Sequence, residues 1–215
     1  MSDAAKRAAG SAAAALVQDG MRLGLGSGTT MRFAIEAIAA RGLHVTGVPT
    51  SEATAKLARE AGIALANLDG PIDLAIDGAD EVELGTLRLI KGHGGALLRE
   101  KIVAHAAGRF VIVADDSKLV PVLGTALPVE VDAFGLKATM ARIAALGGAP
   151  RERPGRSDGG HVILDCPGFA PIRDPYTLER ALRAIPGVIG TGLFLMKVER
   201  VIVGQADGTV REITA

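Results

Sequence analysis

The sequence predicts an α/β protein in which a doubly wound parallel sheet is joined by a smaller α+β unit. Predicted strands and helices alternate over residues 1–126, which is the pattern of a parallel sheet with helices on both faces. The run Arg109-Phe-Val-Ile-Val-Ala114 is almost continuously apolar, as strands buried on both faces are. After Pro128 the predicted order becomes strand–helix–strand–strand–helix–strand, which indicates a split βαβ unit.

Local signals place each element of the first unit. Ser2 and Asp3 precede an alanine-rich stretch and are typical of a helix N-cap, so the first helix is expected over residues 3–19. Ser51 is expected to cap a later helix in the same way. Short apolar runs predict the strands, and longer stretches with helical spacing predict the helices. The expected order is strand 21–25, helix 31–40, strand 43–48, helix 51–61, strands 63–68 and 72–76, a hairpin over 84–90, helix 97–106 and strand 109–114.

The second unit is expected to form a domain of its own. Its elements are a strand over 129–131, a helix over 134–146, a polar turn segment over 151–160, a strand over 161–165 and a helix over 175–185. The tail has strand-like runs at 200–203 and 209–213 around Ala206-Asp-Gly208, a hairpin signal, and is expected to return to the first sheet. We therefore predict a Rossmann-like catalytic domain from residues 1–127 and 199–215, and a ferredoxin-like α+β domain from residues 128–198.

Composition narrows the classes of partner and the cellular location. The chain has 215 residues, of which 48% are hydrophobic, and its 24 basic and 24 acidic side chains give no net charge. We therefore expect neither nucleic acid nor a membrane surface as a partner. Cys166 is the only cysteine, which excludes an internal disulfide and predicts a small buried side chain. The N-terminus lacks the layout of a secretory signal and no apolar run has spanning length, so a cytoplasmic location is expected.

A glycine-rich loop, Gly24-Leu-Gly26-Ser-Gly28-Thr-Thr30, lies between a predicted strand and a predicted helix. Glycines let backbone N–H groups turn toward an anion, and a helix N-terminus adds partial positive charge. The hydroxyls of Ser27, Thr29 and Thr30 suit a terminal phosphate. A dinucleotide site is disfavoured because Thr29 replaces the third glycine and no acid lies near Val48. A tight turn with a capping threonine is the competing structural interpretation.

The acidic segment Asp77-Gly-Ala-Asp80-Glu81 follows a predicted buried strand. Two acids three residues apart can face one cavity, accept hydrogen bonds from sugar hydroxyls and transfer protons when a neighbour shifts their pKa. A single acid of this kind could instead cap a turn. A divalent metal is the competing functional hypothesis, but no histidine or further acid has convincing ligand spacing. We therefore expect no metal.

The segment Lys91-Gly-His-Gly-Gly95 also joins a predicted strand to a predicted helix. Its glycines can present N–H groups and Lys91 supplies a positive charge, so together they could stabilise an oxyanion. Glu100 lies in the following helix, where a glutamate beside Lys101 is usually a solvated surface charge. His93 could act as a base, although glycines on both sides favour a positioning or incidental role.

Four motifs in order resemble the A-type ribose-5-phosphate isomerases: Gly26-Ser-Gly-Thr-Thr30, Asp77-Gly-Ala-Asp-Glu81, Lys91-Gly-His-Gly-Gly-Ala-Leu-Leu-Arg-Glu-Lys-Ile102 and Asp116-Ser-Lys-Leu119. The resemblance runs nearly end to end and includes Phe134-Gly-Leu, Ile163-Leu-Asp-Cys and Ile185-Pro-Gly-Val. Two departures stand out. Thr29-Thr30 replaces the Ser-Thr that is usual in the family, and His93 stands where glycine is common.

The resemblance implies reversible isomerisation of D-ribose 5-phosphate and D-ribulose 5-phosphate through an enediolate, in the non-oxidative pentose phosphate pathway and without a cofactor. Glu100 would be the general base, Lys91 would stabilise the oxyanion, and Asp77 or Asp80 would assist ring opening. The implied substrate-binding residues are Ser27, Gly28, Thr29, Thr30, Asp77, Gly78, Ala79, Asp80, Lys91, Gly92, His93, Gly94 and Lys118. Lys6 could also reach the phosphate, although a helix-surface position is an equal alternative.

The resemblance also implies a homodimer or homotetramer. The main alternative is a non-enzymatic sugar-phosphate sensor domain, which would need the phosphate loop but not Glu100. Such a domain usually adjoins a DNA-binding unit, and no helix-turn-helix or basic segment is present. A coenzyme A transferase-like enzyme is a third possibility, and the lack of a second large α/β half argues against it.

Overall fold

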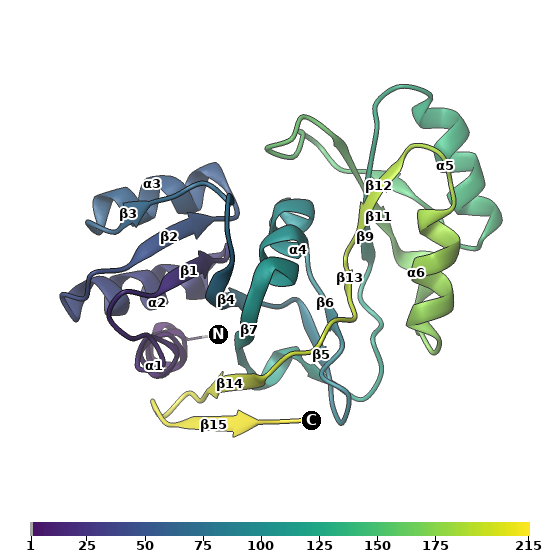
Figure 1. The fold of residues 1–215 in the computed structure, drawn as a ribbon. Coiled ribbons are helices and arrows are strands. Elements are labelled where there is room, and N and C mark those ends of the chain that lie inside the picture. Colours follow the sequence, from purple (N-terminus) through teal and green to yellow (C-terminus); the bar gives the residue numbers. More distant parts are fainter. Residues whose placement is uncertain (1) are drawn as a thin grey trace.

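The computed structural model describes residues 2–215, and its strands form three sheets (Figure 1). The largest has the order β15-β14-β7-β4-β1-β2-β3 and is parallel except for β15, which runs antiparallel to β14. Its strands are β1 (Arg22–Leu25), β2 (Thr46–Pro49), β3 (Ala64–Leu65), β4 (Ile72–Gly78), β7 (Ala107–Asp115), β14 (Arg200–Gly204) and β15 (Val210–Ile213). This architecture confirms the predicted doubly wound sheet, and the tail returns to it as expected.

Helices cover both faces of the large sheet. On one face α1 (Asp3–Ala14) and α2 (Thr29–Ala40) pack against apolar side chains that include Leu23 and Val111. On the other face α4 (Leu97–Ala106) packs against a second cluster that includes Ile112. Neighbouring residues of β7 thus enter opposite cores, which explains its continuous apolar run. The remaining helix of this unit, α3 (Glu52–Glu60), lies beside β2 and β3 and is capped by Ser51 as predicted.

The second sheet has the order β10-β11-β9-β12 with antiparallel neighbours. Its strands are β9 (Leu127–Val131), β10 (Arg151–Glu152), β11 (Val162–Cys166) and β12 (Val188–Thr191), and its helices are α5 (Leu136–Ala145) and α6 (Pro175–Arg183). Since β11 lies between β9 and β10, the unit is the predicted split βαβ arrangement. Both helices lie on the same side of this sheet (Figure 1).

Cys166 is buried, as expected, and burial raises the pKa of its thiol to about 12.

A third sheet was not predicted. It has the order β13-β6-β5-β8, with β5 (Glu81–Glu83), β6 (Leu89–Ile90), β8 (Leu119–Val120) and β13 (Leu193–Phe194). The predicted hairpin is confirmed as the antiparallel pair β5 and β6, but most of residues 84–88 form the turn between them. Because β13 pairs with β6, a segment from the predicted small domain joins the strand that leads to Lys91. The boundaries of the two domains therefore stay a prediction.

Some element boundaries were wrong. The first helix ends at Ala14 and not at Asp19, because the chain then turns and Nη1 of Arg41 donates hydrogen bonds to the carbonyl oxygens of Ala14 and Val17. β3 contains two residues rather than the six expected over 63–68. β10 lies in the segment predicted as turns, since both of its residues are exposed and polar and carry no apolar signal.

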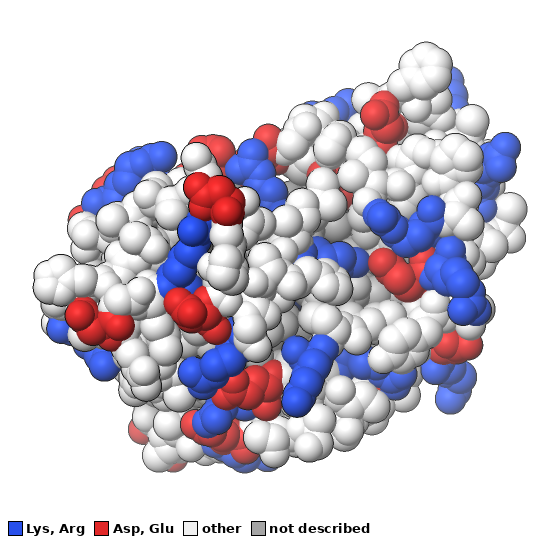
Figure 2. All heavy atoms as spheres, in the orientation of Figure 1, with Lys and Arg blue, Asp and Glu red and all other residues white. Residues whose placement is uncertain are grey.

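The charged side chains on the face seen in Figure 2 are mixed in sign, with basic and acidic groups lying next to each other. This distribution agrees with the balanced composition of 24 basic and 24 acidic side chains. Within residues 2–215, no helix is long and apolar enough to cross a membrane. The described residues also form two short 3-10 helices, at Asp116–Lys118 and Pro167–Phe169.

Candidate active site

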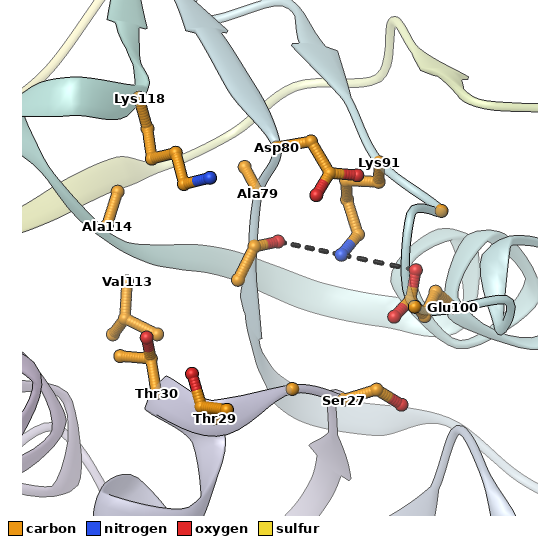
Figure 3. A pocket seen from close by; sticks show the side chains of 14 residues that line it. Ser27, Thr29, Thr30, Ala79, Asp80, Lys91, Glu100, Val113, Ala114 and Lys118 are labelled. Carbon is orange, nitrogen blue, oxygen red and sulfur yellow. Dashed lines mark hydrogen bonds and ion pairs between the residues drawn. The ribbon is translucent and has the colours of Figure 1, made fainter. Parts of the chain in front are cut away.

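A cavity of about 180 Å³ lies at the carboxyl ends of β1, β4 and β7 (Figure 3). β1 and β4 are neighbours, but the helix that follows β1 covers one face of the sheet and the helix that follows β4 covers the other. Such a switch point is where open α/β sheets bind ligands. The cavity is lined by Ser27, Gly28, Thr29, Thr30, Gly78, Ala79, Asp80, Lys91, Gly92, Gly94, Glu100, Val113, Ala114 and Lys118.

The turn between β1 and α2 lies directly against the end of β4. The N–H of Gly26 donates to the carbonyl oxygen of Ile76 at 2.9 Å, and the N–H of Ser27 donates to Oδ1 of Asp77 at 3.1 Å. A Cβ atom on residue 26 would lie 2.1 Å from that same Oδ1. Only glycine therefore permits this approach.

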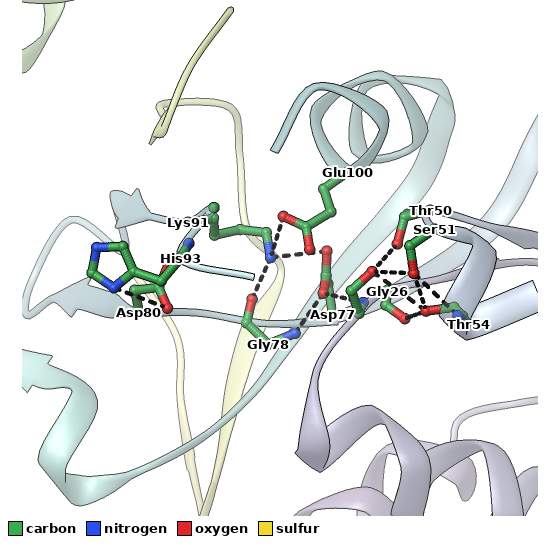
Figure 4. Close-up of polar contacts among 12 residues, drawn as sticks. Gly26, Thr50, Ser51, Thr54, Asp77, Gly78, Asp80, Lys91, His93 and Glu100 are labelled. Carbon is green, nitrogen blue, oxygen red and sulfur yellow. Dashed lines mark hydrogen bonds and ion pairs between the residues drawn. The ribbon is translucent and has the colours of Figure 1, made fainter. Parts of the chain in front are cut away.

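Lys91 holds two buried carboxylates together (Figure 4). Its Nζ lies 2.9 Å from Oδ2 of Asp77 and 3.3 Å from Oε2 of Glu100, and it donates to the carbonyl oxygen of Gly78 at 2.7 Å. All three charged side chains are at least 95% buried. The three elements that supply them are β4, the loop after β6 and α4, so the site requires the sheet, the hairpin and the helix together.

The two carboxylates differ in their hydrogen bonds. Oδ1 of Asp77 accepts from the N–H groups of Ser27 and Gly78, and Oδ2 faces Lys91, so both oxygens have donors. Oε2 of Glu100 is buried near Lys91 but accepts no hydrogen bond. Hydrogen bonding to the charged form favours ionised Asp77, and its lack at Glu100 leaves that side chain as the group that can take up a proton.

The pKa values follow from burial and from the shared lysine. Burial raises the pKa of Glu100 to about 7, and the charge of Asp77 adds to the rise against the lowering effect of Lys91. Burial also raises the pKa of Asp77, opposed by Lys91. Burial by itself would lower the pKa of Lys91, but the two carboxylates raise it to about 12. Lys91 thus stays an ammonium at neutral pH, where Glu100 can both take and release a proton.

Glu100 therefore does not have the surface position that its sequence neighbours favoured. It is 5% exposed and lines the cavity, because α4 packs against β4 and places this side chain 3.3 Å from Lys91. The local pattern predicted a solvated position for this residue, whereas the family resemblance predicted a place in the site; its catalytic role stays a prediction.

Asp80 lines the cavity and also binds the glycine loop. Its Oδ2 accepts the N–H of His93 at 2.9 Å, and its Oδ1 lies 3.5 Å from Nδ1 of the His93 ring. Nε2 of the ring is 2.9 Å from the carbonyl oxygen of Ala126. The imidazole thus lies between Asp80 and the carbonyl of Ala126, and His93 is not among the residues that line the cavity, which favours a positioning role over that of a base.

The other side of the cavity carries hydroxyl and ammonium groups. Thr29, Thr30 and Lys118 lie across the cavity from Lys91 and Glu100 (Figure 3). Since α2 begins at Thr29, the partial positive charge of its N-terminus lies at the cavity and favours an anion there. Lys6 is not among the lining residues, and its Nζ lies 3.8 Å from Asp3.

The hydroxyl of Ser27 belongs to a group that sequence reasoning missed. It lies 2.8 Å from Oγ1 of Thr50, 3.1 Å from Oγ of Ser51 and 3.3 Å from Oγ1 of Thr54 (Figure 4). Thr54 in turn donates to the carbonyl oxygen of Gly26 at 3.0 Å. Thr50, Ser51 and Thr54 do not line the cavity, but their hydroxyls hold the turn between β1 and α2 in place. The pattern Thr50-Ser51-x-x-Thr54 was the available signal, but only its helix cap was read.

Within residues 2–215, no three histidine, cysteine, aspartate or glutamate side chains are grouped so that they could hold a metal ion. The charge that faces the buried carboxylates is supplied by Lys91.

Comparisons with known proteins agree on one family. The family model described as ribose 5-phosphate isomerase A (phosphoriboisomerase A) matches residues 46–208. Ribose-5-phosphate isomerase A of Thermomicrobium roseum is 51% identical over 95% of this chain and 91% of the relative. The corresponding protein of Gloeobacter violaceus is 50% identical over 96% of this chain and 94% of the relative.

Solved structures give the same result. Ribose 5-phosphate isomerase A of Methanocaldococcus jannaschii superposes with a TM-score of 0.92 at 38% identity, covering 98% of both chains. The enzyme of Neisseria gonorrhoeae has a TM-score of 0.93 at 34% identity, covering 98% of this chain and 96% of the other. A D-ribose-5-phosphate isomerase in complex with phospho-erythronic acid has a TM-score of 0.92 at 36% identity, covering 98% of both chains.

Proposed function

Because the chain belongs to the ribose 5-phosphate isomerase A family, it is an isomerase that interconverts D-ribose 5-phosphate and D-ribulose 5-phosphate, and we propose that Glu100 and Lys91 carry the reaction. The observation that supports these roles is a buried carboxylate oxygen of Glu100 that accepts no hydrogen bond and lies 3.3 Å from the Lys91 ammonium in the cavity.

Substrate binding uses the two sides of the cavity. The phosphate lies against the start of α2, where Thr29, Thr30 and Lys118 supply hydroxyl, backbone and ammonium donors. The sugar carbons then face Glu100 and Asp80. The relative in complex with phospho-erythronic acid, itself a phosphorylated acid, supports a sugar-phosphate ligand for this site.

Ring opening is assigned to Asp80 rather than Asp77. Asp80 lines the cavity, whereas both oxygens of Asp77 are occupied by Lys91 and by backbone N–H groups. Asp80 takes the proton of the C1 hydroxyl and passes a proton to the ring oxygen as the bond from that oxygen to C1 breaks. Asp77 orients Lys91.

The hydrogen shift is carried out by Glu100. Its carboxylate removes the proton from C2 of the open aldose, and the electron pair moves through C1 to the carbonyl oxygen, which gives an enediolate. The proton of the C2 hydroxyl passes to that oxygen, Glu100 returns its proton to C1, and a carbonyl forms at C2. A pKa of about 7 suits a group that must act as base and then as acid.

Lys91 balances the charge during this shift. When Glu100 takes the proton, the negative charge passes from its carboxylate to the substrate oxygen. The ammonium, 3.3 Å from Glu100, is then free to turn one N–H toward the new anion. Since Asp77 and Gly78 keep the other two N–H groups, Lys91 does not need to move from its place.

The proposal is tested by adding ribose 5-phosphate to the purified protein and measuring ribulose 5-phosphate. Wild-type protein should form the ketose, and Glu100→Gln should still bind the sugar phosphate but turn over at least ~100-fold more slowly. Glu60→Gln, at an exposed glutamate of α3, is the matched control and should be fully active. Near-normal turnover by Glu100→Gln would remove the proposed base.

The relatives do not support the alternative of a non-enzymatic sensor, since those compared above are named as isomerases.

Cytoplasmic location and assembly into a homodimer or homotetramer stay predictions. Self-association is supported by large apolar side chains on the surface, such as Phe134, which is 91% exposed. Sedimentation of the purified protein would establish its oligomeric state.

A further inference from the structure

We propose that Arg153 is a positioning residue for the isomerisation and that it acts by fixing the backbone of the glycine loop 92–95. The catalytic part of this inference rests on the proposed function. Arg153 follows β10 in the small α+β unit, far in sequence from the residues that line the cavity.

The guanidinium of Arg153 is held on one edge and binds the loop with the other. Its Nε donates to Oδ2 of Asp165 at 3.0 Å, and its Nη2 bonds to Oδ1 of the same carboxylate. Its Nη1 donates to the carbonyl oxygens of Gly92 at 2.9 Å and His93 at 3.1 Å. The bidentate contact with Asp165 thus fixes the orientation in which the Arg153 guanidinium binds the loop carbonyls.

These contacts determine where the loop N–H groups point. In a trans peptide the C=O and the following N–H point in opposite directions. The carbonyl of Gly92 faces Arg153, and the next N–H, that of His93, accordingly donates to Asp80 on the other side. The carbonyl of His93 also faces Arg153, which directs the N–H of Gly94 away from Arg153.

The N–H of Gly94 is the group that this arrangement offers to the substrate. Gly94 lines the cavity together with Lys91 and Glu100, and across residues 2–215 its N–H donates to no protein atom. It is therefore a free donor beside the place where charge develops, of the kind that stabilises an oxyanion.

The loop needs an external support because its own sequence supplies little rigidity. Gly92 and Gly95 have φ values of +112° and +85°, and glycine samples many other conformations at little cost. Asp80 holds the loop from the cavity side and Arg153 from the opposite side. A lysine could keep the charge of Arg153, but it has no planar fork to bind Asp165 and two carbonyl groups together.

Arg153→Lys tests the inference. Misplacing the loop by about 1 Å should lower kcat by about 10²-fold. KM for ribose 5-phosphate should change little, because Thr29, Thr30 and Lys118 are untouched. Arg151→Lys, at an exposed position two residues earlier, is the matched control and should behave as wild type. A wild-type kcat in Arg153→Lys, or an equal loss in Arg151→Lys, would overturn the proposal.

Amide hydrogen exchange separates this inference from the proposed function. The N–H groups of His93 and Gly95 donate to Asp80 and to the carbonyl of Gly92, and both should exchange faster in Arg153→Lys than in wild type. Unchanged exchange would overturn the positioning role whatever the activity. Faster exchange together with a wild-type protein that forms no ketose would instead refute the proposed function alone.

A second variant covers the case in which Arg153→Lys does not fold. Asp165→Asn keeps the arginine but removes the carboxylate that fixes its direction. Relative to wild type, its exchange at His93 and Gly95 should rise and its kcat should fall. Unchanged values of both would refute the positioning role.

Discussion

Glu100 and Asp77 contact the same ammonium group, but only one of them is free to exchange a proton. Each oxygen of Asp77 faces a donor, whereas Oε2 of Glu100 accepts no hydrogen bond. Burial beside Asp77 then raises the pKa of Glu100 to about 7, and Lys91 limits the rise. The two carboxylates thus differ in their hydrogen bonds although both contact Lys91, and the proposed mechanism depends on this difference.

The first prediction concerns the pH dependence of wild-type catalysis. In the proposed mechanism only ionised Glu100 removes the C2 proton, so kcat/KM should rise as the pH increases through about 7. Initial rates of ketose formation across neutral pH would show this. A profile that is flat through this range would contradict the assignment of the base to Glu100.

The second prediction compares two lysines of the cavity. Lys91→Met leaves Asp77 and Glu100 buried together without a cation, which should lower the free energy of unfolding by about 3–5 kcal/mol and abolish turnover. Lys118→Met removes a lysine that lines the cavity and has no carboxylate within ion-pair distance among residues 2–215. It should raise KM with little effect on denaturant unfolding. Equal stability loss in both variants would contradict this account.

At the residue scale, the sequence predicted that Asp77 and Lys91 lie at one site but not the different protonation behaviour of the two buried carboxylates. Asp77 and Lys91 each end an apolar strand, and such strand ends were expected to share one cavity. Glu100 lies in the polar run Arg99-Glu100-Lys101, and without the family resemblance it would have been placed in solvent. It is instead buried beside Lys91, whose Nζ also lies 5.4 Å from the ring of Phe194, and no local sequence pattern indicates such contacts.

At the scale of elements, the strand-to-helix turns decide the geometry of the site. The turn after β1 lies on the end of β4 only because residue 26 has no side chain. The hydroxyls of Thr50 and Thr54 then fasten this turn to the start of α3. α4 was predicted with its observed bounds, Leu97–Ala106, whereas two-residue strands such as β3 and β10 have too little sequence to be recognised.

The third prediction tests the close approach of the first turn. In Gly26→Ala the new Cβ would lie 2.1 Å from Oδ1 of Asp77, so the turn must move and should break the bond from the N–H of Ser27. We expect a loss of about 1–3 kcal/mol in unfolding free energy, together with a lower kcat. Gly108→Ala, in β7 with its nearest neighbours at 3.7 Å, is the control and should be close to neutral. A fully active and stable Gly26→Ala would show that the turn is not constrained.

At the scale of the whole molecule, the two predicted units are tied together around the site. The segment after β10 reaches α3, where the N–H of Glu52 donates to Asp158 at 2.8 Å. Arg99 lies 3.0 Å from Glu52 and donates to the carbonyl oxygen of Asp158 at 3.3 Å. The doubly wound sheet and the split βαβ unit were both predicted, but these links join residues far apart in sequence and left no periodic signal.

The fourth prediction concerns global stability. The pKa of Glu100 is raised from 4.5 to about 7, so its contribution to stability is present below the lower value and is lost as the pH rises through the upper one. Glutamine cannot ionise, so Glu100→Gln should be more stable than wild type above neutral pH, by on the order of 3 kcal/mol. Denaturant unfolding at several pH values checks this. The difference should vanish near pH 4.5, and a variant that is less stable than wild type above neutral pH would contradict the prediction.

The pairing of β13 with β6 has a consequence for how the enzyme is made. The N–H of Lys91 donates to the carbonyl oxygen of Gly192 at 2.9 Å, and Leu193 pairs with Ile90. A chain that is still emerging from the ribosome has the lysine long before it has this partner strand. The nascent protein therefore cannot complete the cavity around Lys91 in step with synthesis, and we expect activity to arise only after translation has passed residue 194.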